Sequence, residues 1–430
     1  MRALQAIMML LFVISGCASM IDPRVLATQP VEASIPIAPL EDGIYTLPGS
    51  GVSHILLLFP GGTILDSRGK EGAVELLCSA MIAGGTKDAN PAEVEGALDD
   101  LAIDISINPQ REYTLVGMSF LDDVTGKAMQ LLLDILKTPR LDASRLETER
   151  GILTESIIRE EEDAVTVAFD TYRAHYYRGD PRAYKPTPDT IKAISRDDLV
   201  NLHRMIFTKR PLIGVIGRLE KHYAGLLKDA FLTTWTAYPL GPSPNPAFGS
   251  FKGSAKERQC VFLMAHAAPT MHAVDYAASV VADHIIGSGG FNSLLVKEVR
   301  TREGLAYSAN SFYQTRPRWG VFGITVITEP SALKQVRNAV DRVFSEIRSG
   351  ISEEDVTWAK QAVMNRYAIL YNTPAGIISH TMDAAFYGIL QDFDAGFLAR
   401  VGTLTRTDVQ NAALKLIEGP WVEVVINPGD

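Results

Sequence analysis

An internal repeat is the feature that most restricts how this chain of 430 residues can fold. Residues 194–199 (ISRDDL) match residues 404–409 (LTRTDV) at an offset of 210 positions. The same offset aligns residues 141–144 (LDAS) with residues 351–354 (ISEE). A repeat at one fixed spacing indicates that the same structural unit is built twice. We therefore predict two homologous domains, so that a fold proposed for one half must also suit the other.

The hydrophobic pattern predicts the same order of elements in each half. Ile103, Ile105 and Ile107 alternate with polar residues, as in a half-buried strand. Strands are predicted at 103–107 and 113–120, then at 307–313 and 320–327, and helices at 124–136 and 144–159, then at 332–347 and 353–370. Strands followed by runs of helices indicate an α+β fold, in which helices cover one face of an antiparallel sheet.

Two proline-rich segments divide the chain. Residues 18–40 contain several prolines and show no hydrophobic periodicity, and residues 238–250 (YPLGPSPNPAFGS) have a similar composition. Such segments are typical of linkers, because they do not form a packed core. We predict a flexible tether at 17–40, a first domain at 41–235, a linker at 236–250 and a second domain at 251–430.

The first residues have the pattern of a targeting segment. Arg2 precedes an apolar run over residues 6–14, which is too short to cross a bilayer. The sequence Ile14-Ser15-Gly16-Cys17 resembles the bacterial lipobox, in which cleavage leaves a lipidated N-terminal cysteine. The resemblance implies a signal peptide at 1–16, a lipid anchor on Cys17 and, since alanine follows, an outer-membrane position facing the periplasm. A plain signal peptide or a short membrane helix is the alternative.

Charge and cysteine content restrict the possible functions. The net charge of −9 argues against a nucleic-acid partner, because nucleic-acid binding needs a basic surface. Hydrophobic residues make up 47% of the chain, which is enough for two domains with cores. Beyond Cys17 only Cys78 and Cys260 remain, on a predicted helix and a predicted strand of different halves. We expect two buried thiols, although an oxidising compartment would permit a bridge.

Four stretches of the chain carry a family resemblance. They are residues 70–86 (KEGAVELLCSAMIAGGT), 111–114 (REYT), 180–207 (DPRAYKPTPDTIKAISRDDLVNLHRMIF) and 287–308 (GSGGFNSLLVKEVRTREGLAYS), of which the last two are the most specific. They resemble the M16 metallopeptidases, a family that includes pitrilysin, insulin-degrading enzyme and the mitochondrial processing peptidase. The resemblance covers roughly residues 42–427. It implies two domains, each an antiparallel sheet covered by helices, that form a clamshell around unfolded peptide.

The zinc motif of that family is missing. Active members carry His-x-x-Glu-His on the first helix, where two histidines bind zinc and the glutamate polarises a bound water. The corresponding positions in this chain are Glu75, Cys78 and Ser79, and none of the eight histidines lies in this helix. Glu155 lies near the place of a further zinc-binding glutamate, but an isolated carboxylate does not hold zinc. A site made of Glu75, Cys78 and Glu155 is the alternative, and the apolar residues around Cys78 indicate a packed thiol instead. We predict no metal or other cofactor in this chain.

Arg300 and Tyr307, in contrast, match the family pattern in the second half. In the family this pair lies across a cavity from the zinc, where the arginine holds the peptide backbone and the tyrosine stabilises the oxyanion. Arginine offers a fixed set of donors, and a placed phenol can donate to charge that develops in the transition state. Gly304 is predicted to end the helix before Tyr307 starts a strand. The alternatives are a solvated cation at a helix end and a half-buried strand aromatic.

The pattern resembles the non-catalytic member of two-subunit bacterial M16B peptidases. The resemblance implies a heterodimer in which a partner with His-x-x-Glu-His carries zinc, while Arg300 and Tyr307 act in trans on unfolded peptide substrates. A peptide-binding or scaffolding lipoprotein without peptidase activity is the second hypothesis. An enzyme that acts alone through an unrecognised site is the third.

Overall fold

A computed structural model describes residues 39–40, 44–49, 51–218, 221–231, 243–389 and 392–429. The predicted signal peptide, Cys17 and almost all of the predicted tether lie outside these residues, as does part of the predicted linker. The boundaries of those segments therefore stay predictions. No helix in the described ranges is both long enough and apolar enough to span a membrane.

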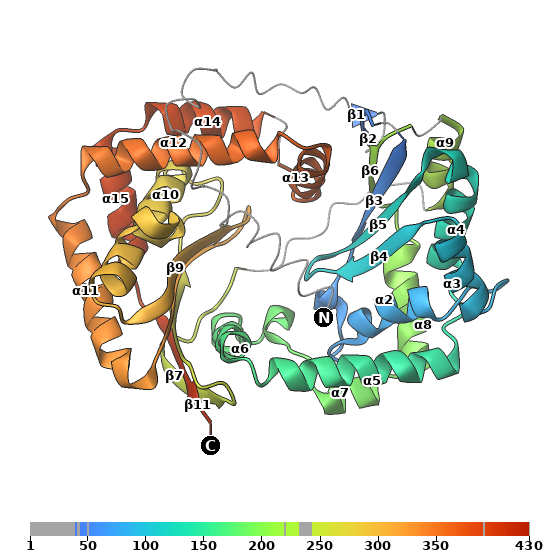
Figure 1. Ribbon diagram of the computed structural model, residues 1–430, viewed down its shortest axis with the longest axis horizontal. Coiled ribbons are helices and arrows are strands. Elements are labelled where there is room, and N and C mark those ends of the chain that lie inside the picture. The colour runs from blue at the N-terminus through green and yellow to red at the C-terminus, as the bar shows by residue number, and fades with distance from the viewer. Residues whose placement is uncertain are drawn as a thin grey trace. The chain divides into compact units, whose positions relative to one another are not determined.

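The first sheet belongs to the first half of the chain (Figure 1). Its strands are β1 (Pro39–Leu40), β2 (Ile44–Leu47), β3 (Val52–Pro60), β4 (Asp104–Pro109), β5 (Tyr113–Leu121) and β6 (Leu212–Ile216). They are arranged in the order β1-β2-β6-β3-β5-β4. Neighbouring strands are antiparallel, except that β2 runs parallel to β6.

The second sheet repeats this arrangement. Its strands are β7 (Gly249–Ala255), β8 (Cys260–Ala267), β9 (Ala306–Thr315), β10 (Gly320–Thr328) and β11 (Val422–Pro428), in the order β7-β11-β8-β10-β9. Here β7 runs parallel to β11, and the other neighbours are antiparallel. If the short β1 is set aside, the first strand of each half pairs in parallel with the last strand of the same half: β2 pairs with β6, and β7 pairs with β11. The predicted α+β fold with two homologous halves is confirmed, and each sheet adds one parallel pair to the expected antiparallel pattern.

Helices cover one face of each sheet. The first half contributes α2 (Ala73–Ala83), α3 (Pro91–Asp100), α4 (Thr125–Lys137), α5 (Ala143–Glu160), α7 (Pro188–Ala193), α8 (Arg196–Phe207) and α9 (Lys221–Ala230). The second half contributes α10 (Tyr276–Asp283), α11 (Leu333–Ser349), α12 (Glu353–Leu370), α14 (Phe393–Thr403) and α15 (Arg406–Ile417). The four helices predicted from periodicity correspond to α4, α5, α11 and α12.

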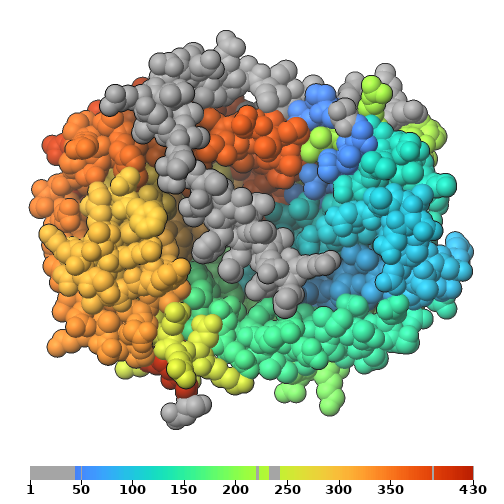
Figure 2. Space-filling model, viewed as in Figure 1, coloured from blue at the N-terminus to red at the C-terminus, as the bar shows by residue number. Residues whose placement is uncertain are grey.

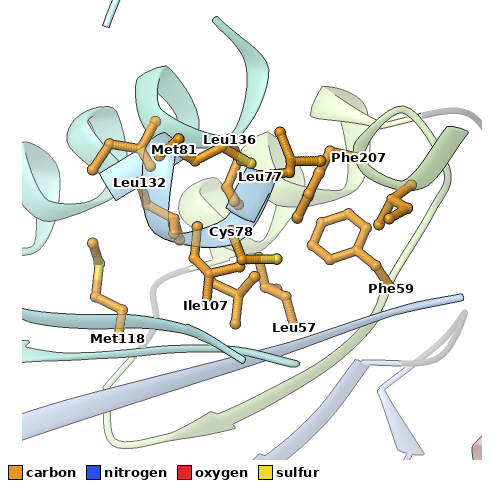
Figure 3. Close-up of a cluster of buried hydrophobic side chains, with 14 of the residues drawn as sticks. Leu57, Phe59, Leu77, Cys78, Met81, Ile107, Met118, Leu132, Leu136 and Phe207 are labelled. Atoms are coloured by element: carbon orange, nitrogen blue, oxygen red, sulfur yellow. The ribbon is translucent and has the colours of Figure 1, made fainter. Parts of the chain in front are cut away.

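The core of the first half lies between α2 and the sheet. Leu77, Cys78 and Met81 of α2 belong to one buried cluster with Leu57 of β3 and Ile107 of β4 (Figure 3). The expectation of two buried thiols is confirmed, because Cys78 and Cys260 are both free and buried.

The opposite face of each sheet is covered by a helix from the other half. Helix α6 (Ala164–Tyr176) of the first half places Tyr172 and Tyr176 in one cluster with Leu263 of β8. Atoms of the first half, in green, lie against yellow atoms of the second (Figure 2). Helix α13 (Pro374–Phe386) of the second half packs Ile378 and Met382 against the first sheet. Strand β8 and residues 57–60 of β3 are thus buried on both faces, which explains their nearly continuous apolar sequences.

Candidate functional site

The segment that carries Arg300 and Tyr307 joins α10 to the edge strand β9. After α10 the chain forms a π-helical turn, η4 (His284–Ser288), then a second one, η6 (Val296–Arg302). Such turns are rare and occur frequently at functional sites. Gly304 has a φ of 62° and ends the helical segment, and the Leu305 N–H donates to the Val299 carbonyl at 2.9 Å. The predicted helix stop is therefore confirmed, because this backbone conformation strongly favours glycine.

The structure brings Arg300 and Tyr307 together at the surface. The guanidinium carbon of Arg300 lies 5.5 Å from the ring centroid of Tyr307. The Tyr307 side chain is 78% exposed, so the alternative of a half-buried strand aromatic is wrong. Across the described ranges, no residue forms a hydrogen bond or an ion pair with the Arg300 guanidinium or with the Tyr307 hydroxyl. Both groups are therefore available to a ligand.

The acidic residues near Arg300 are occupied by other arginines. Glu298 accepts from Arg302 at 2.8 Å and from Arg342 at 2.6 Å. Arg342 also pairs with Glu303 at 3.0 Å. Carboxylates are thus present near Arg300, but they pair with Arg302 and Arg342 instead.

Sequence reasoning missed a third member of this site, Phe291. Its ring centroid lies 5.0 Å from the guanidinium carbon of Arg300, and its side chain is 70% exposed. Phe291 follows Gly289 and Gly290 and precedes Asn292, outside any hydrophobic periodicity. A large aromatic residue in such a polar, glycine-rich context was the signal that could have identified it.

The zinc-motif positions of the first half do not converge on one point. Glu75 is exposed and lines a pocket of about 230 Å³ whose other lining residues include Asp66, Glu71, Arg111 and Tyr184. The Cys78 side chain is 1% exposed and points into the core instead (Figure 3). The Ser79 hydroxyl donates to the Leu76 carbonyl of its own helix at 3.2 Å. Within the described ranges, no group of three or more His, Cys, Asp or Glu side chains could hold a metal ion.

Burial and neighbouring carboxylates shift the pKa values of groups at this pocket. Although the Glu75 side chain reaches the surface, loss of hydration of its carboxyl group in the pocket is the largest cause that raises its pKa to about 7, and the charges of Glu160 and Asp66 add to it. Burial raises the pKa of Asp66 to about 6, although Asp66 accepts backbone hydrogen bonds from Gly72 and Val74 at the start of α2. Burial also raises the pKa of the Cys78 thiol well above its ordinary value, which disfavours the thiolate that a metal would need. Glu155 is exposed on α5 and does not line the pocket.

Known proteins resemble this chain in both halves. The family model "Insulinase (Peptidase family M16)" matches residues 46–186, and "Peptidase M16 inactive domain" matches residues 215–363. The chain is 23% identical over 372 residues to "Non-peptidase homolog YmxG" of Helicobacter pylori, which covers 84% of this chain and 85% of that protein. It is 25% identical over 342 residues to mitochondrial-processing peptidase subunit beta of Rattus norvegicus, covering 75% and 69%.

Solved structures show the same fold. A structure described as peptidase M16 inactive domain from Pseudomonas fluorescens superposes with a TM-score of 0.79 at 19% identity, covering 90% of this chain and 95% of that one. A protease from Helicobacter pylori gives a TM-score of 0.76 at 14% identity, covering 90% and 98%. Since the two matched segments together span most of both halves, the chain belongs to peptidase family M16, as a member that lacks the zinc motif.

Proposed function

We propose that this chain is the non-catalytic subunit of a heterodimeric M16 zinc metallopeptidase, lipid-anchored in the bacterial cell envelope. In this proposal a partner with His-x-x-Glu-His carries the zinc, and this chain supplies Arg300 and Tyr307. The observation that carries the proposal is the exposed pair itself. Its donors have no partner in the described ranges, and the first half of the same chain has no metal site among those residues.

The two side chains would have different tasks on a bound peptide. Arg300 has five N–H donors in a planar fork and would hold a backbone carbonyl of the unfolded substrate. The Tyr307 hydroxyl would donate to the oxygen of the scissile carbonyl as negative charge develops on it. The partner's zinc would supply the Lewis acid and the attacking water. The chain would thus contribute substrate binding and part of the transition-state stabilisation.

A second candidate function is peptide binding or scaffolding without any peptidase partner. The similarity to a protein named "Non-peptidase homolog YmxG" favours it, since that name describes a relative without peptidase activity. A peptide-binding protein would also use Arg300 and Tyr307, whereas a scaffold would not need them. The two candidate functions differ in whether a zinc-bearing chain completes the site.

Metal content and activity separate these proposals. We expect the purified mature chain to contain no stoichiometric zinc and to leave unfolded peptides uncleaved, because Glu75, Cys78 and Ser79 do not form a ligand set. Adding a chain of similar size that carries His-x-x-Glu-His should give cleavage that a chelator abolishes. The measurements are elemental analysis and peptide cleavage, with each chain alone as a control. Stoichiometric zinc together with chelator-sensitive proteolysis in this chain alone would contradict the proposal.

The lipid anchor makes a prediction about location. Cys17→Ala removes the thiol that would be lipidated, so the protein should move from the membrane fraction to a soluble or unprocessed form. Cys260→Ala, the same change at a buried thiol, should leave the distribution unchanged. Fractionation and the mass of the mature N-terminus are the measurements. A wild-type protein that is soluble and begins after residue 17 would rule out the anchor.

A further inference from the structure

The loop that carries Phe291 is fixed, although its aromatic ring is exposed. Gly290 has a φ of 64°, and its carbonyl accepts from the Ser293 N–H at 3.0 Å and from the Ser293 hydroxyl at 2.7 Å. A Cβ atom added to Gly289 would collide with the indole of Trp358, so the loop backbone is packed against α12. The backbone that carries this 70% exposed side chain is therefore held by contacts to the buried Ser293 and the partly buried Trp358.

Within the described ranges, the Arg300 guanidinium contacts the rings of Phe291 and Tyr307 and forms no hydrogen bond or ion pair. Its guanidinium carbon lies 5.0 Å from the centroid of the first ring and 5.5 Å from that of the second. A cation within about 6 Å of an aromatic face is attracted by the quadrupole of the ring. Neither ring is a hydrogen-bond acceptor of the kind that a carboxylate is, so these contacts leave the N–H donors of the guanidinium available, unlike an ion pair. A long arginine side chain can thus be ordered without losing its capacity to bind a carbonyl.

We propose that Phe291 is a positioning residue that orders Arg300 for peptide binding. This inference rests on the proposed function, in which Arg300 holds a substrate carbonyl. Phe291 acts through Arg300 and not through its own contact with the peptide. Removing the aromatic face would allow the guanidinium to sample more conformations, and binding would then have to order it.

A double-mutant cycle tests this role by comparing Phe291→Leu, Arg300→Ala and the double variant. The readout is the binding of fluorescein-labelled oxidised insulin B chain, an unfolded peptide probe, measured by anisotropy with the purified full chain. We expect Phe291→Leu to weaken binding about two- to fivefold, the range given by a cation–π contact at an exposed site. It should have no further effect when Arg300 is already alanine. Phe291→Tyr keeps the aromatic face and should restore binding to near the wild-type level.

A matched control is available at the other edge of the same sheet. Phe248 is 46% exposed and precedes β7, whereas Phe291 lies near β9. Phe248→Leu makes the same chemical change and should leave binding unchanged. In the reconstituted heterodimer, Phe291→Leu should raise KM more than it lowers kcat, because it disturbs a group that binds the ground state.

The outcomes separate this inference from the proposed function. An equal loss from Phe291→Leu in both Arg300 backgrounds, or no loss in either, would overturn the positioning role while leaving the role of Arg300 intact. If Arg300→Ala and Tyr307→Phe change neither binding nor turnover, the proposed function itself fails. Circular dichroism and the midpoint of thermal unfolding should match the wild type in every variant, because Phe291, Arg300 and Phe248 are all exposed.

Discussion

Replacing Tyr307 by Phe should lower the turnover of the reconstituted heterodimer by about a hundred- to a thousandfold, the typical cost of one oxyanion donor. The change removes a single hydroxyl from a side chain that is 78% exposed, so folding and assembly should remain nearly intact. Arg300→Ala should weaken both substrate binding and turnover, since it removes a group that holds the peptide before and during reaction. The measurement is peptide cleavage by co-purified complexes at matched assembly.

Two controls keep this prediction specific. Tyr223→Phe removes a hydroxyl from α9 in the other half of the chain and should leave turnover unchanged. The zinc content of the partner should be the same in every complex, because neither Arg300 nor Tyr307 is a proposed ligand. Unchanged rates in both variants would mean that the pair is structural, and the role of this chain in the complex would reduce to scaffolding or peptide holding.

The second large effect is expected at Gly214 of β6, a strand of the first sheet against which α13 packs. A Cβ atom at this position would lie 2.5 Å from the Met382 Sδ atom and 2.6 Å from the Ile378 Cγ2 atom. Both side chains are at most 1% exposed and have no room to move aside. Overfilling a packed interior typically costs about 1–3 kcal/mol. Gly214→Ala should therefore lower the free energy of unfolding by about that amount in urea titrations and increase amide exchange in α13.

Gly117 provides a matched control for this substitution. Gly117 and Gly214 are both register partners of Leu56 in β3, on its two sides. The Cβ atom of Gly117→Ala would meet only the Ser106 hydroxyl at 3.1 Å and a Leu56 methyl at 3.9 Å. The partly exposed Ser106 hydroxyl needs to move by only a few tenths of an ångström, and the new Cβ atom restricts the unfolded chain, so Gly117→Ala should cost much less stability than Gly214→Ala. Equal stabilities of the two variants would show that α13 is not packed at Gly214 as described.

The repeat was the strongest predictor of the fold. It required one architecture in both halves, and the equivalent strand orders of the two sheets agree with it. Local signals also predicted element ends well. The predicted strand at 113–120 corresponds to β5 (Tyr113–Leu121), and Gly304, predicted to end a helix, ends η6. Each of these features depends on residues that are close in sequence, which is why periodicity and capping rules identify them.

The packing of helices against strands that are far away in the sequence could not be predicted in the same way. The apolar residues of α6 and α13 indicate that one side of each helix is buried. Their spacing does not indicate which of the two sheets that side packs against. The continuous apolar runs in β3 and β8 were the available sign that both faces of each sheet are covered. At the candidate site, the Arg300 and Tyr307 pair followed from a family resemblance. The Phe291 contact depends on how the loop turns at Gly290, which no spacing rule gives.

The exchange of α6 and α13 also bears on the ancestry of this chain. A single half of this kind would expose one face of its sheet and carry one helix with no sheet to cover. Two copies could each lend that helix to the other, as in a domain-swapped dimer with two-fold symmetry. Gene duplication would then have joined two such protomers into one polypeptide and freed them to diverge. On this view, the two halves descend from one ancestral subunit and specialised separately, the first in helix α2 and the second in the segment 287–308.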